Sequence, residues 1–350
     1  MGTVRTSCKV EFPLRIDLAG GWSDTPPICY EMGGVVLNAA VSLNGKNPVC
    51  AEVKRLREPV VKVESADLGR KGALTERAEI YGPQDPNDWC ALVKSALCVT
   101  DYDFSQGGLS IRISADVPKG SGMGTSSILG ASLVQALLTV RDGAVPEWPV
   151  VAERTLALER TMGTGGGWED QLGALVPGVK LLSTRPGAKQ KFTVKTLSPA
   201  AQRKFARFLA DRGVLFFTGQ KRMARNVLRG VIDFYRKNPE GIAHAIIKVL
   251  KRDAAESFAA LEHGDFQTFM VKLNAYWRNK KALDPGSTNP EVEAIIARIS
   301  PWTDAVSLCG AGGGGFLFAI ARSRSDKAKM QRVLAKIGNG GKCYDFRVEG

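Results

Sequence analysis

The segment PKGSGMGTSS, residues 118–127, has the composition of a loop that binds phosphate. Its three alternating glycines let the backbone approach an anion closely and turn its N–H groups toward it. A helical pattern begins near Ser126, and the positive end of a helix dipole favours a phosphate there. The hydroxyls of Thr125, Ser126 and Ser127 suit phosphate oxygens or a magnesium ion. The alternative is an ordinary turn from strand to helix, capped by a serine.

Two familiar phosphate loops do not fit this segment. The pattern G-x-x-x-x-G-K-[ST] does not occur in the chain. The dinucleotide pattern G-x-G-x-x-G would need glycine at position 125, where threonine stands. Asp142 does follow about 20 residues on, but it lies in the turn RDGAVPE rather than at the end of a strand. The sequence therefore indicates a third kind of phosphate loop.

A second glycine cluster, ERTMGTGGGWEDQ at 159–171, carries two carboxylates. Glu159 lies near the end of an expected helix, and Asp170 follows it across four glycines. Phosphoryl transfer needs a carboxylate that binds Mg²⁺ and a second one that accepts the proton of the substrate hydroxyl. The pair fits these two roles. The alternative is a solvated glutamate and a loop aspartate.

The third glycine run, CGAGGGGFLFAI at 309–320, has apolar flanks that resemble strands. Glycine runs are often flexible linkers. Because both flanks are strand-like, we expect instead a tight turn that lies against a ligand or another loop.

Near the N-terminus, PLRIDLAGGWSDTPPICYEMGG at 13–34 combines charges with an apolar strand. Arg15 and Asp17 lie on the expected strand, and a buried arginine beside an acidic site stabilises a carboxylate and developing phosphate charge. Asp24, after the Gly-Gly turn, could accept hydrogen bonds from the vicinal hydroxyls of a sugar. The alternative is an aspartate that caps the turn before Pro26-Pro27.

The helices and strands that must position these loops neither alternate strictly nor separate fully along the chain. This order favours an α+β fold in two domains. The turn at Pro186-Gly187 within 181–190 is the expected boundary, giving domains 1–190 and 191–350. Period-2 and period-3.6 patterns predict the individual elements. The expected strands are 35–43, 49–56, 108–116, 213–219, 304–309 and 316–321, and the expected helices are 87–99, 126–141, 149–162, 199–211, 220–236, 241–263 and 265–282, followed by a last helix and strand.

The composition and charge of the chain limit the classes of function that it can have. The 350 residues are 44% hydrophobic and 24% charged, as in globular proteins. The net charge of +13 would suit nucleic acid, an acidic membrane or a nucleoside triphosphate. Aromatic residues make up only 7% and do not gather in the basic stretch 322–342, which we expect to be the solvent face of the last helix. We therefore expect no nucleic-acid partner.

Cysteine and histidine usage points away from zinc and disulfides. Seven scattered cysteines without a C-x-x-C pair and two histidines predict neither, so a reducing cytoplasm fits best. No apolar run approaches the roughly 18 residues that a membrane span requires, and we expect no membrane partner.

Together these segments resemble the signature motifs of the GHMP small-molecule kinases, in order and spacing over essentially the whole chain. Within that family, GGWSDTPPICYE, VPKGSGMGTSSILG, GTGGGWEDQLG, TGQKRMARNVL and LCGAGGGGFLF resemble the branch that phosphorylates L-fucose. The string Gly-Glu-His-Thr-Asp of galactokinases is replaced here by GGWSD, which disfavours galactose.

The resemblance implies roles for individual residues. Ser126 and Glu159 would bind Mg²⁺, Asp170 would be the catalytic base, and Arg15 would stabilise that carboxylate and the transferring phosphoryl group. The ATP-binding residues would be Lys119, Gly120, Ser121, Gly122, Met123, Gly124, Thr125, Ser126 and Ser127. The residues around the sugar would be Trp22, Asp24, Gly167, Trp168 and Gly313.

The implied fold is a ribosomal-S5-like N-terminal domain followed by a ferredoxin-like C-terminal domain. The implied reaction converts ATP and L-fucose to ADP and β-L-fucose 1-phosphate. A related branch acts on D-glycero-D-manno-heptose 7-phosphate, whose extra phosphate would need a cationic clamp such as Lys221, Arg222 and Arg225. Nothing in the chain corresponds to the pyrophosphorylase half of bifunctional fucokinases, so we expect a stand-alone kinase or a fragment. The sequence does not predict an oligomeric state.

Overall fold

The structure is a computed structural model that describes residues 5–82, 85, 88–220, 224–237 and 241–350. The chain forms two compact units from interleaved segments. Unit 1 contains Met1–Leu14, Asn47–Val117 and Gly124–Val176, and unit 2 contains Arg15–Lys46, Pro118–Met123 and Pro177–Gly350. The expected division into contiguous domains 1–190 and 191–350 stays a prediction. The mixture of helices and sheets agrees with the expected α+β class.

Unit 1 contains a five-stranded sheet in which neighbouring strands are antiparallel except β5 and β7, which are parallel. In sheet order its strands are β1 (Ser7–Phe12), β4 (Val49–Leu56), β7 (Gly108–Ala115), β5 (Val61–Ser65) and β6 (Arg70–Leu74). Strand β7 illustrates the period-2 alternation of apolar and polar residues. Leu109, Ile111 and Ile113 are buried, while Arg112 between them is exposed. One face of the sheet is therefore apolar.

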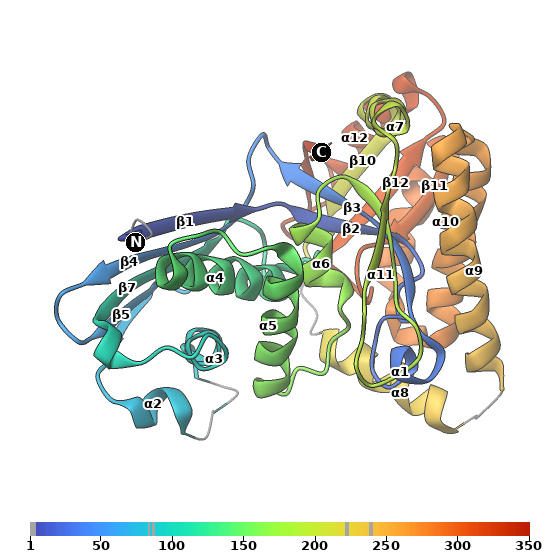
Figure 1. The fold of residues 1–350 in the computed structure, drawn as a ribbon. Helices are drawn as coiled ribbons and strands as arrows, with labels where there is room; N and C mark the ends of the chain where they lie inside the picture. Colours follow the sequence, from blue (N-terminus) through green and yellow to red (C-terminus); the bar gives the residue numbers. More distant parts are fainter. Residues whose placement is uncertain (1–4, 83–84, 86–87, 221–223, 238–240) are drawn as a thin grey trace. The chain divides into compact units, whose positions relative to one another are not determined.

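Helix α4 (Thr125–Asp142) covers that sheet, packing against β1 and β4 (Figure 1). Most of its residues from Ile128 to Val140 are buried, since further helices of unit 1 pack against it from the other side. It ends at Gly143, whose left-handed backbone (φ +76°) suits glycine. The other helices of unit 1 are α2 (Arg77–Tyr81), α3 (Ala91–Val99), α5 (Trp148–Thr161) and α6 (Glu169–Leu175), with a short 3₁₀ turn at Phe104–Gln106.

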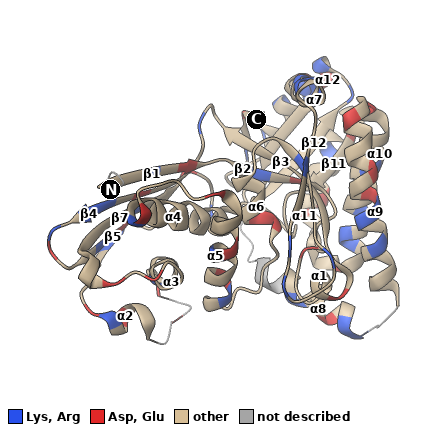
Figure 2. Ribbon diagram, viewed as in Figure 1, with Lys and Arg blue, Asp and Glu red and all other residues tan. Residues whose placement is uncertain are grey.

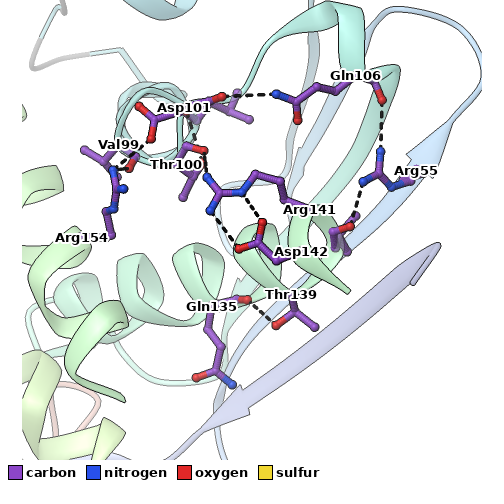
Figure 3. Close-up of polar contacts among 12 residues, drawn as sticks. Arg55, Val99, Thr100, Asp101, Gln106, Gln135, Thr139, Arg141, Asp142 and Arg154 are labelled. Carbon is purple, nitrogen blue, oxygen red and sulfur yellow. Dashed lines mark hydrogen bonds and ion pairs between the residues drawn. The ribbon is translucent and has the colours of Figure 1, made fainter. Parts of the chain in front are cut away.

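Two arginines bind the carbonyl groups at the end of α3 (Figure 3). Arg154 Nη1 donates to Val99 O at 2.7 Å, and Arg141 Nη1 donates to Thr100 O at 2.8 Å. Arg141 is itself held by Asp142, whose Oδ1 accepts from its Nε at 2.6 Å. The last carbonyls of a helix lack partners within the helix and lie at its negative end, so these cations stabilise α3 where it stops.

The described residues of unit 2 form two sheets. One consists of β11 (Thr303–Leu308), β12 (Phe316–Ala321), β10 (Gly213–Phe217) and β13 (Lys342–Tyr344), in that order. The other consists of β14 (Phe346–Val348), β3 (Val35–Leu43), β8 (Val179–Ser183) and β9 (Thr193–Thr196), with β2 (Leu14–Ala19) also paired to β3.

The helices of unit 2 cover these sheets. Helix α9 (Ile242–His263) packs on β3, and helix α10 (Phe266–Leu283) packs on both α9 and β11 (Figure 1). A core cluster joins residues of β10, β11 and β12 to α10, α11 and α12, including Phe216, Trp277, Ile299 and Leu334. The helices are α1 (Ile28–Met32), α7 (Pro199–Arg212), α8 (Ala224–Lys237), α9 (Ile242–His263), α10 (Phe266–Leu283), α11 (Pro290–Ile299) and α12 (Arg324–Leu334), with 3₁₀ turns at Pro285–Ser287 and Ser300–Trp302.

The basic stretch 322–342 contains α12, as expected (Figure 2). Arg324 and Lys329 are exposed, whereas Met330 and Leu334 are buried in the core cluster. The interpretation of this charge run as the solvent face of the last helix is confirmed. Among the described residues, no helix is both long and apolar enough to cross a membrane.

Candidate active site

The first half of the phosphate-loop segment, Pro118–Met123, belongs to unit 2. Gly120 and Gly122 have φ of +73° and +75°, which side-chain-bearing residues rarely adopt. The carbonyl of Gly122 accepts a hydrogen bond of 2.8 Å from Arg15 Nη1, and the buried side chain of Met123 anchors the end of this half. Lys119 is exposed at its start. Arg15 and the buried Met123 thus hold the end of this half, while its beginning at Lys119 is exposed to solvent.

The two glycine loops of unit 2 pack backbone against backbone. Phe316 N donates to Ser121 O at 2.9 Å. A Cβ at Gly122 would lie 2.5 Å from Cys309 O, and one at Gly310 would collide with the carbonyl of Gly122. Only glycine permits this approach. The interpretation of 309–320 as a tight turn against another loop is confirmed.

The same glycine run is fixed from its other side. Asn289 Nδ2 donates to Gly313 O at 3.0 Å, and Gly313 N donates to Ser287 O. Thr218 Oγ1 donates to Gly315 O at 2.9 Å. Because these carbonyls and N–H groups have fixed partners, the run is a rigid turn and not a linker.

Arg15 and Asp17 lie on β2, and both are buried, with 3% and 2% of their surface exposed. Arg15 Nη1 lies 3.6 Å from Asp17 Oδ1. Asp17 also accepts from Tyr276 Oη at 2.8 Å and from Lys280 Nζ at 3.1 Å. Sequence reasoning did not find Tyr276 and Lys280. A signal exists, since Lys280 falls on the apolar face of α10, one helical turn beyond Tyr276.

Trp22 and Asp24 lie in the turn that follows β2. Ser23 fixes this turn, donating from Oγ to Gly20 O at 2.6 Å and accepting from Val35 N at 3.0 Å. Trp22 has a positive φ of +75°, and it and Asp24 are nearly buried, with 8% and 5% exposed. Burial raises the pKa of the Cys29 thiol to about 12, and the Asp24 carboxylate contributes to this rise.

In unit 1, Asp170 lies against the start of α4. A Cβ at Gly124 would be 2.9 Å from both Cβ and Cγ of Asp170 and 3.1 Å from its Oδ1. Gly124 is the last residue before α4 and has φ of +74°. The sequence alternative of a loop aspartate is wrong, because Asp170 belongs to the first turn of α6. Its carboxylate therefore lies where the phosphate-loop segment becomes a helix.

The hydroxyl residues at the start of α4 differ in exposure. Ser126 is exposed, whereas Thr125 and Ser127 are partly buried. Gly167 and Trp168 immediately precede α6, and Trp168 is only 2% exposed.

Glu159 lies near the end of α5 with 8% of its surface exposed. Its Oε2 accepts from Thr164 Oγ1 at 3.3 Å. A Cβ at Gly166 would be 3.0 Å from the same oxygen, so the glycine loop folds closely over the carboxylate. A carboxylate and the Ser126 hydroxyl are hard oxygen donors, which fit Mg²⁺. Within the described part of the chain, no group of three or more His, Cys, Asp or Glu side chains forms a metal site.

The two units divide the expected site residues between them. Gly124, Thr125, Ser126, Ser127, Glu159, Gly167, Trp168 and Asp170 lie in unit 1, and Arg15, Trp22, Asp24, Lys119, Gly120, Ser121, Gly122, Met123 and Gly313 lie in unit 2. The expected cationic clamp lies outside the described residues. Lys221 and Arg222 are not among them, and of Arg225 only the backbone is described.

Family models match both halves of the chain. The model described as GHMP kinases N terminal domain matches residues 91–178, and GHMP kinases C terminal matches residues 257–340. The chain belongs to the GHMP kinase family. The N-terminal match includes the phosphate-loop segment, Glu159 and Asp170, and the C-terminal match includes the glycine run at 309–320.

Curated relatives of this GHMP kinase include three sugar-related enzymes. The bifunctional fucokinase/GDP-fucose pyrophosphorylase of Arabidopsis thaliana is 37% identical over 97% of the chain and 32% of that protein. The L-fucokinase/L-fucose-1-P guanylyltransferase of Bacteroides fragilis is 32% identical over 93% of the chain and 35% of that protein. The D-glycero-alpha-D-manno-heptose 7-phosphate kinase of Campylobacter jejuni is 29% identical over 100% of the chain and 98% of that protein. The chain thus spans about a third of the length of the first two.

The fold agrees with the family. The crystal structure of Lactococcus lactis galactokinase in complex with galactose superposes with a TM-score of 0.75 at 16% identity, covering 99% of this chain and 95% of the other. The expected two-domain GHMP kinase fold is confirmed.

Proposed function

We propose that this GHMP kinase transfers the γ-phosphoryl group of ATP to the anomeric hydroxyl of L-fucose and releases β-L-fucose 1-phosphate and ADP. The observation that carries the chemistry is the contact between Asp170 and Gly124, which brings a carboxylate to the residue where the phosphate-loop segment becomes α4. The choice of sugar is supported by the 37% and 32% identity to the two fucokinase relatives.

In the proposed mechanism, Asp170 accepts the proton of the O1 hydroxyl as that oxygen attacks the γ-phosphorus. The bond between the γ-phosphorus and the β,γ-bridging oxygen breaks, and ADP leaves with its electron pair. The α4 N-terminus next to Asp170 is the positive end of an 18-residue helix, which favours both the carboxylate and nearby phosphate oxygens.

Residues 119–127 would hold the triphosphate through backbone N–H groups and hydroxyls, as the positive-φ glycines at 120, 122 and 124 allow. Ser126 and Glu159 would hold Mg²⁺, which supplies charge neutralisation on the phosphate oxygens. Arg15 would stabilise the Asp170 carboxylate and the transferring phosphoryl group.

For the sugar, we assign hydrogen bonding of the ring hydroxyls to Asp24. Trp22 or Trp168 would form an apolar wall against the C6 methyl group, and Gly167 and Gly313 would let the backbone approach the sugar closely. In this proposal 1–190 and 191–350 are the two functional domains, and the enzyme works in the cytoplasm.

One alternative substrate has a specific observation in its favour. The heptose 7-phosphate kinase of Campylobacter jejuni matches this chain over 98% of its own length. Its identity of 29% is lower than the 37% and 32% of the fucokinase relatives, which is why L-fucose is preferred.

A comparison of kcat/KM across sugars at saturating ATP tests the proposal. L-Fucose should be the best substrate. D-Arabinose lacks the C6 methyl and L-galactose adds a hydroxyl to it, so each should be poorer by roughly 10- to 200-fold. D-Galactose has mirror-placed hydroxyls and should be far worse, because it loses its hydrogen bonds to Asp24.

Heptose 7-phosphate completes the panel and should be inert. If heptose 7-phosphate or D-galactose exceeds L-fucose in kcat/KM, the assignment to L-fucose is wrong, while membership of the kinase family is unaffected. ADP release in the absence of any sugar is the blank for each measurement.

A further inference from the structure

Asp17, Tyr276 and Lys280 form a buried cluster in unit 2, and none of the three has a role assigned above. Asp17 is 2% exposed and Lys280 is fully buried. Lys280 Nζ donates to Asp17 Oδ2 at 3.1 Å, and Tyr276 Oη donates to the same oxygen at 2.8 Å. Tyr276 and Lys280 both come from α10, so one helix face supplies both donors.

The cluster also holds the beginning of the glycine run at 309–320. Gly310 N donates to Asp17 Oδ1 at 2.7 Å, and Lys280 Nζ donates to Leu308 O at 2.7 Å. Both partners of the ion pair therefore bind the backbone on either side of Cys309. Charged partners make these hydrogen bonds stronger than those between neutral groups.

The cluster also contacts the phosphate-loop segment, through Arg15. Arg15 Nη1 lies 3.6 Å from Asp17 Oδ1 and donates to Gly122 O at 2.8 Å. Gly122 in turn packs against the backbone of Cys309 and Gly310. Asp17 thus joins Arg15 to the start of the glycine run.

We infer that Asp17 is a positioning residue, which with Lys280 fixes Arg15 and both glycine loops in the geometry that phosphoryl transfer requires. The inference rests on the proposed function, which assigns residues 119–127 to ATP and Arg15 to the transferring phosphoryl group. Displacement of a catalytic group by about 1 Å costs roughly 100-fold in rate, so loss of the cluster should be visible in turnover.

The variant Asp17→Asn is the first test. Its amide oxygen can still accept from Gly310 N, but the charge that orients Arg15 and Lys280 is gone. We expect kcat to fall by about 10- to 100-fold. The KM for ATP should rise, because the phosphate-loop segment loosens. The KM for the sugar should change less, since Gly313 is held by Asn289 and Ser287 outside the cluster. Wild-type kcat in Asp17→Asn would overturn the inference.

A second variant separates positioning from simple stability. Replacing both members of a buried ion pair restores neutrality and often restores stability. Asp17→Asn/Lys280→Met should therefore unfold at a higher temperature than Asp17→Asn, while its kcat stays low because the Asp17 carboxylate is still missing beside Arg15. If kcat recovers together with the melting temperature, the cluster is only structural.

Leu334→Ala is the matched control. Leu334 is fully buried in the core cluster of unit 2, and none of the contacts described for Asp17 involves it. It should lower the melting temperature yet leave kcat near the wild-type value at a temperature at which it remains folded. An equal loss of kcat in Leu334→Ala would assign the Asp17→Asn effect to general destabilisation and overturn the inference.

Failure of the proposed function would look different. The kinetics use whichever sugar of the panel the wild-type protein phosphorylates fastest, so an error about L-fucose does not affect the test. If no sugar is phosphorylated, direct binding of the non-hydrolysable analogue AMPPNP decides. Asp17→Asn should then bind it several-fold more weakly than Leu334→Ala, and equal affinities would overturn the inference.

Discussion

The contact between Asp170 and Gly124 leaves no room for a side chain at position 124. A methyl group there would press on Asp170 Cβ, Cγ and Oδ1, and φ of +74° is itself unfavourable for any residue with a Cβ. Two separate constraints, one on the backbone and one on the neighbouring carboxylate, thus require glycine at this position.

We expect Gly124→Ala to lower kcat by at least about 100-fold, because the added methyl displaces the Asp170 carboxylate. Gly69→Ala is the matched control, since Gly69 has φ of +63° and no atom would lie within 4 Å of its Cβ. Both variants should lose about 1–2 kcal/mol of unfolding free energy from backbone strain. Steady-state kinetics and urea denaturation of the pair distinguish the effects. Equal kcat in the two variants would contradict the assigned geometry.

Asp170→Asn should nearly abolish phosphoryl transfer and leave ATP binding close to normal, because an amide cannot accept the O1 proton. Single-turnover kinetics with the preferred sugar measures the chemical step, and binding of a fluorescent ATP analogue is the control. Chemistry at nearly the wild-type rate would remove Asp170 from the role of base and leave it only the orientation of the hydroxyl.

At this scale the sequence offers candidates within one motif but not partners far apart. Asp170 and Glu159 are proposed as site residues because glycine-rich segments around a carboxylate form a local pattern. The partners of Asp17 were not found, since Tyr276 and Lys280 are 259 and 263 residues away from it. No local spacing can connect residues that only the tertiary fold brings together.

Among the elements, the strands with apolar or alternating runs were predicted best. β3 and β4 have the predicted bounds of 35–43 and 49–56. Helix α6 was missed because it has only seven residues and follows directly on a glycine cluster, which masks its helical pattern. The helix predicted over 87–99 begins later, at Ala91. The hairpin of β5 and β6 was also missed, since β6 (Arg70–Leu74) is exposed except for its last residue.

The end of α3 offers a test of element stability. We expect Arg141→Ala to lower the free energy of unfolding by about 1–2 kcal/mol, because the carbonyl of Thr100 loses a charged donor at the negative end of the helix. Arg112→Ala is the control, since Arg112 is 59% exposed on β7, and its loss should stay within about 0.5 kcal/mol. Urea denaturation of both variants measures the difference. Equal losses would show that the contact with Thr100 does not stabilise α3.

For the molecule as a whole, buried thiols predict a loss of stability at alkaline pH. Burial raises the pKa of Cys29 to about 12 and those of Cys90 and Cys343 to about 11, from an ordinary value of 9.0. Below pH 9 these thiols are protonated in both the folded and unfolded chain. Between pH 9 and 11 the unfolded chain loses its protons first, so the free energy of unfolding should fall as the pH rises.

Denaturation in urea with a reducing agent at pH 8, 9, 10 and 11 measures this fall. Cys29→Ala should show a shallower decline than the wild-type protein, whatever its stability at pH 8, because one of the titrating groups is gone. Parallel declines in the two proteins would show that Cys29 does not contribute.

The interleaving of segments also has a consequence for how the chain reaches its native state. Asn44 and Asp345 are 301 residues apart and hydrogen bonded, and β14 pairs with Val41–Leu43 at the end of β3. Such pairings impose a high contact order, which slows folding because long loops must close first. During synthesis, the Val41–Leu43 edge of β3 exists well before Phe346–Val348 has emerged from the ribosome. An open strand edge is a template for intermolecular pairing, so the nascent chain is exposed to aggregation at β3 until its last strand arrives.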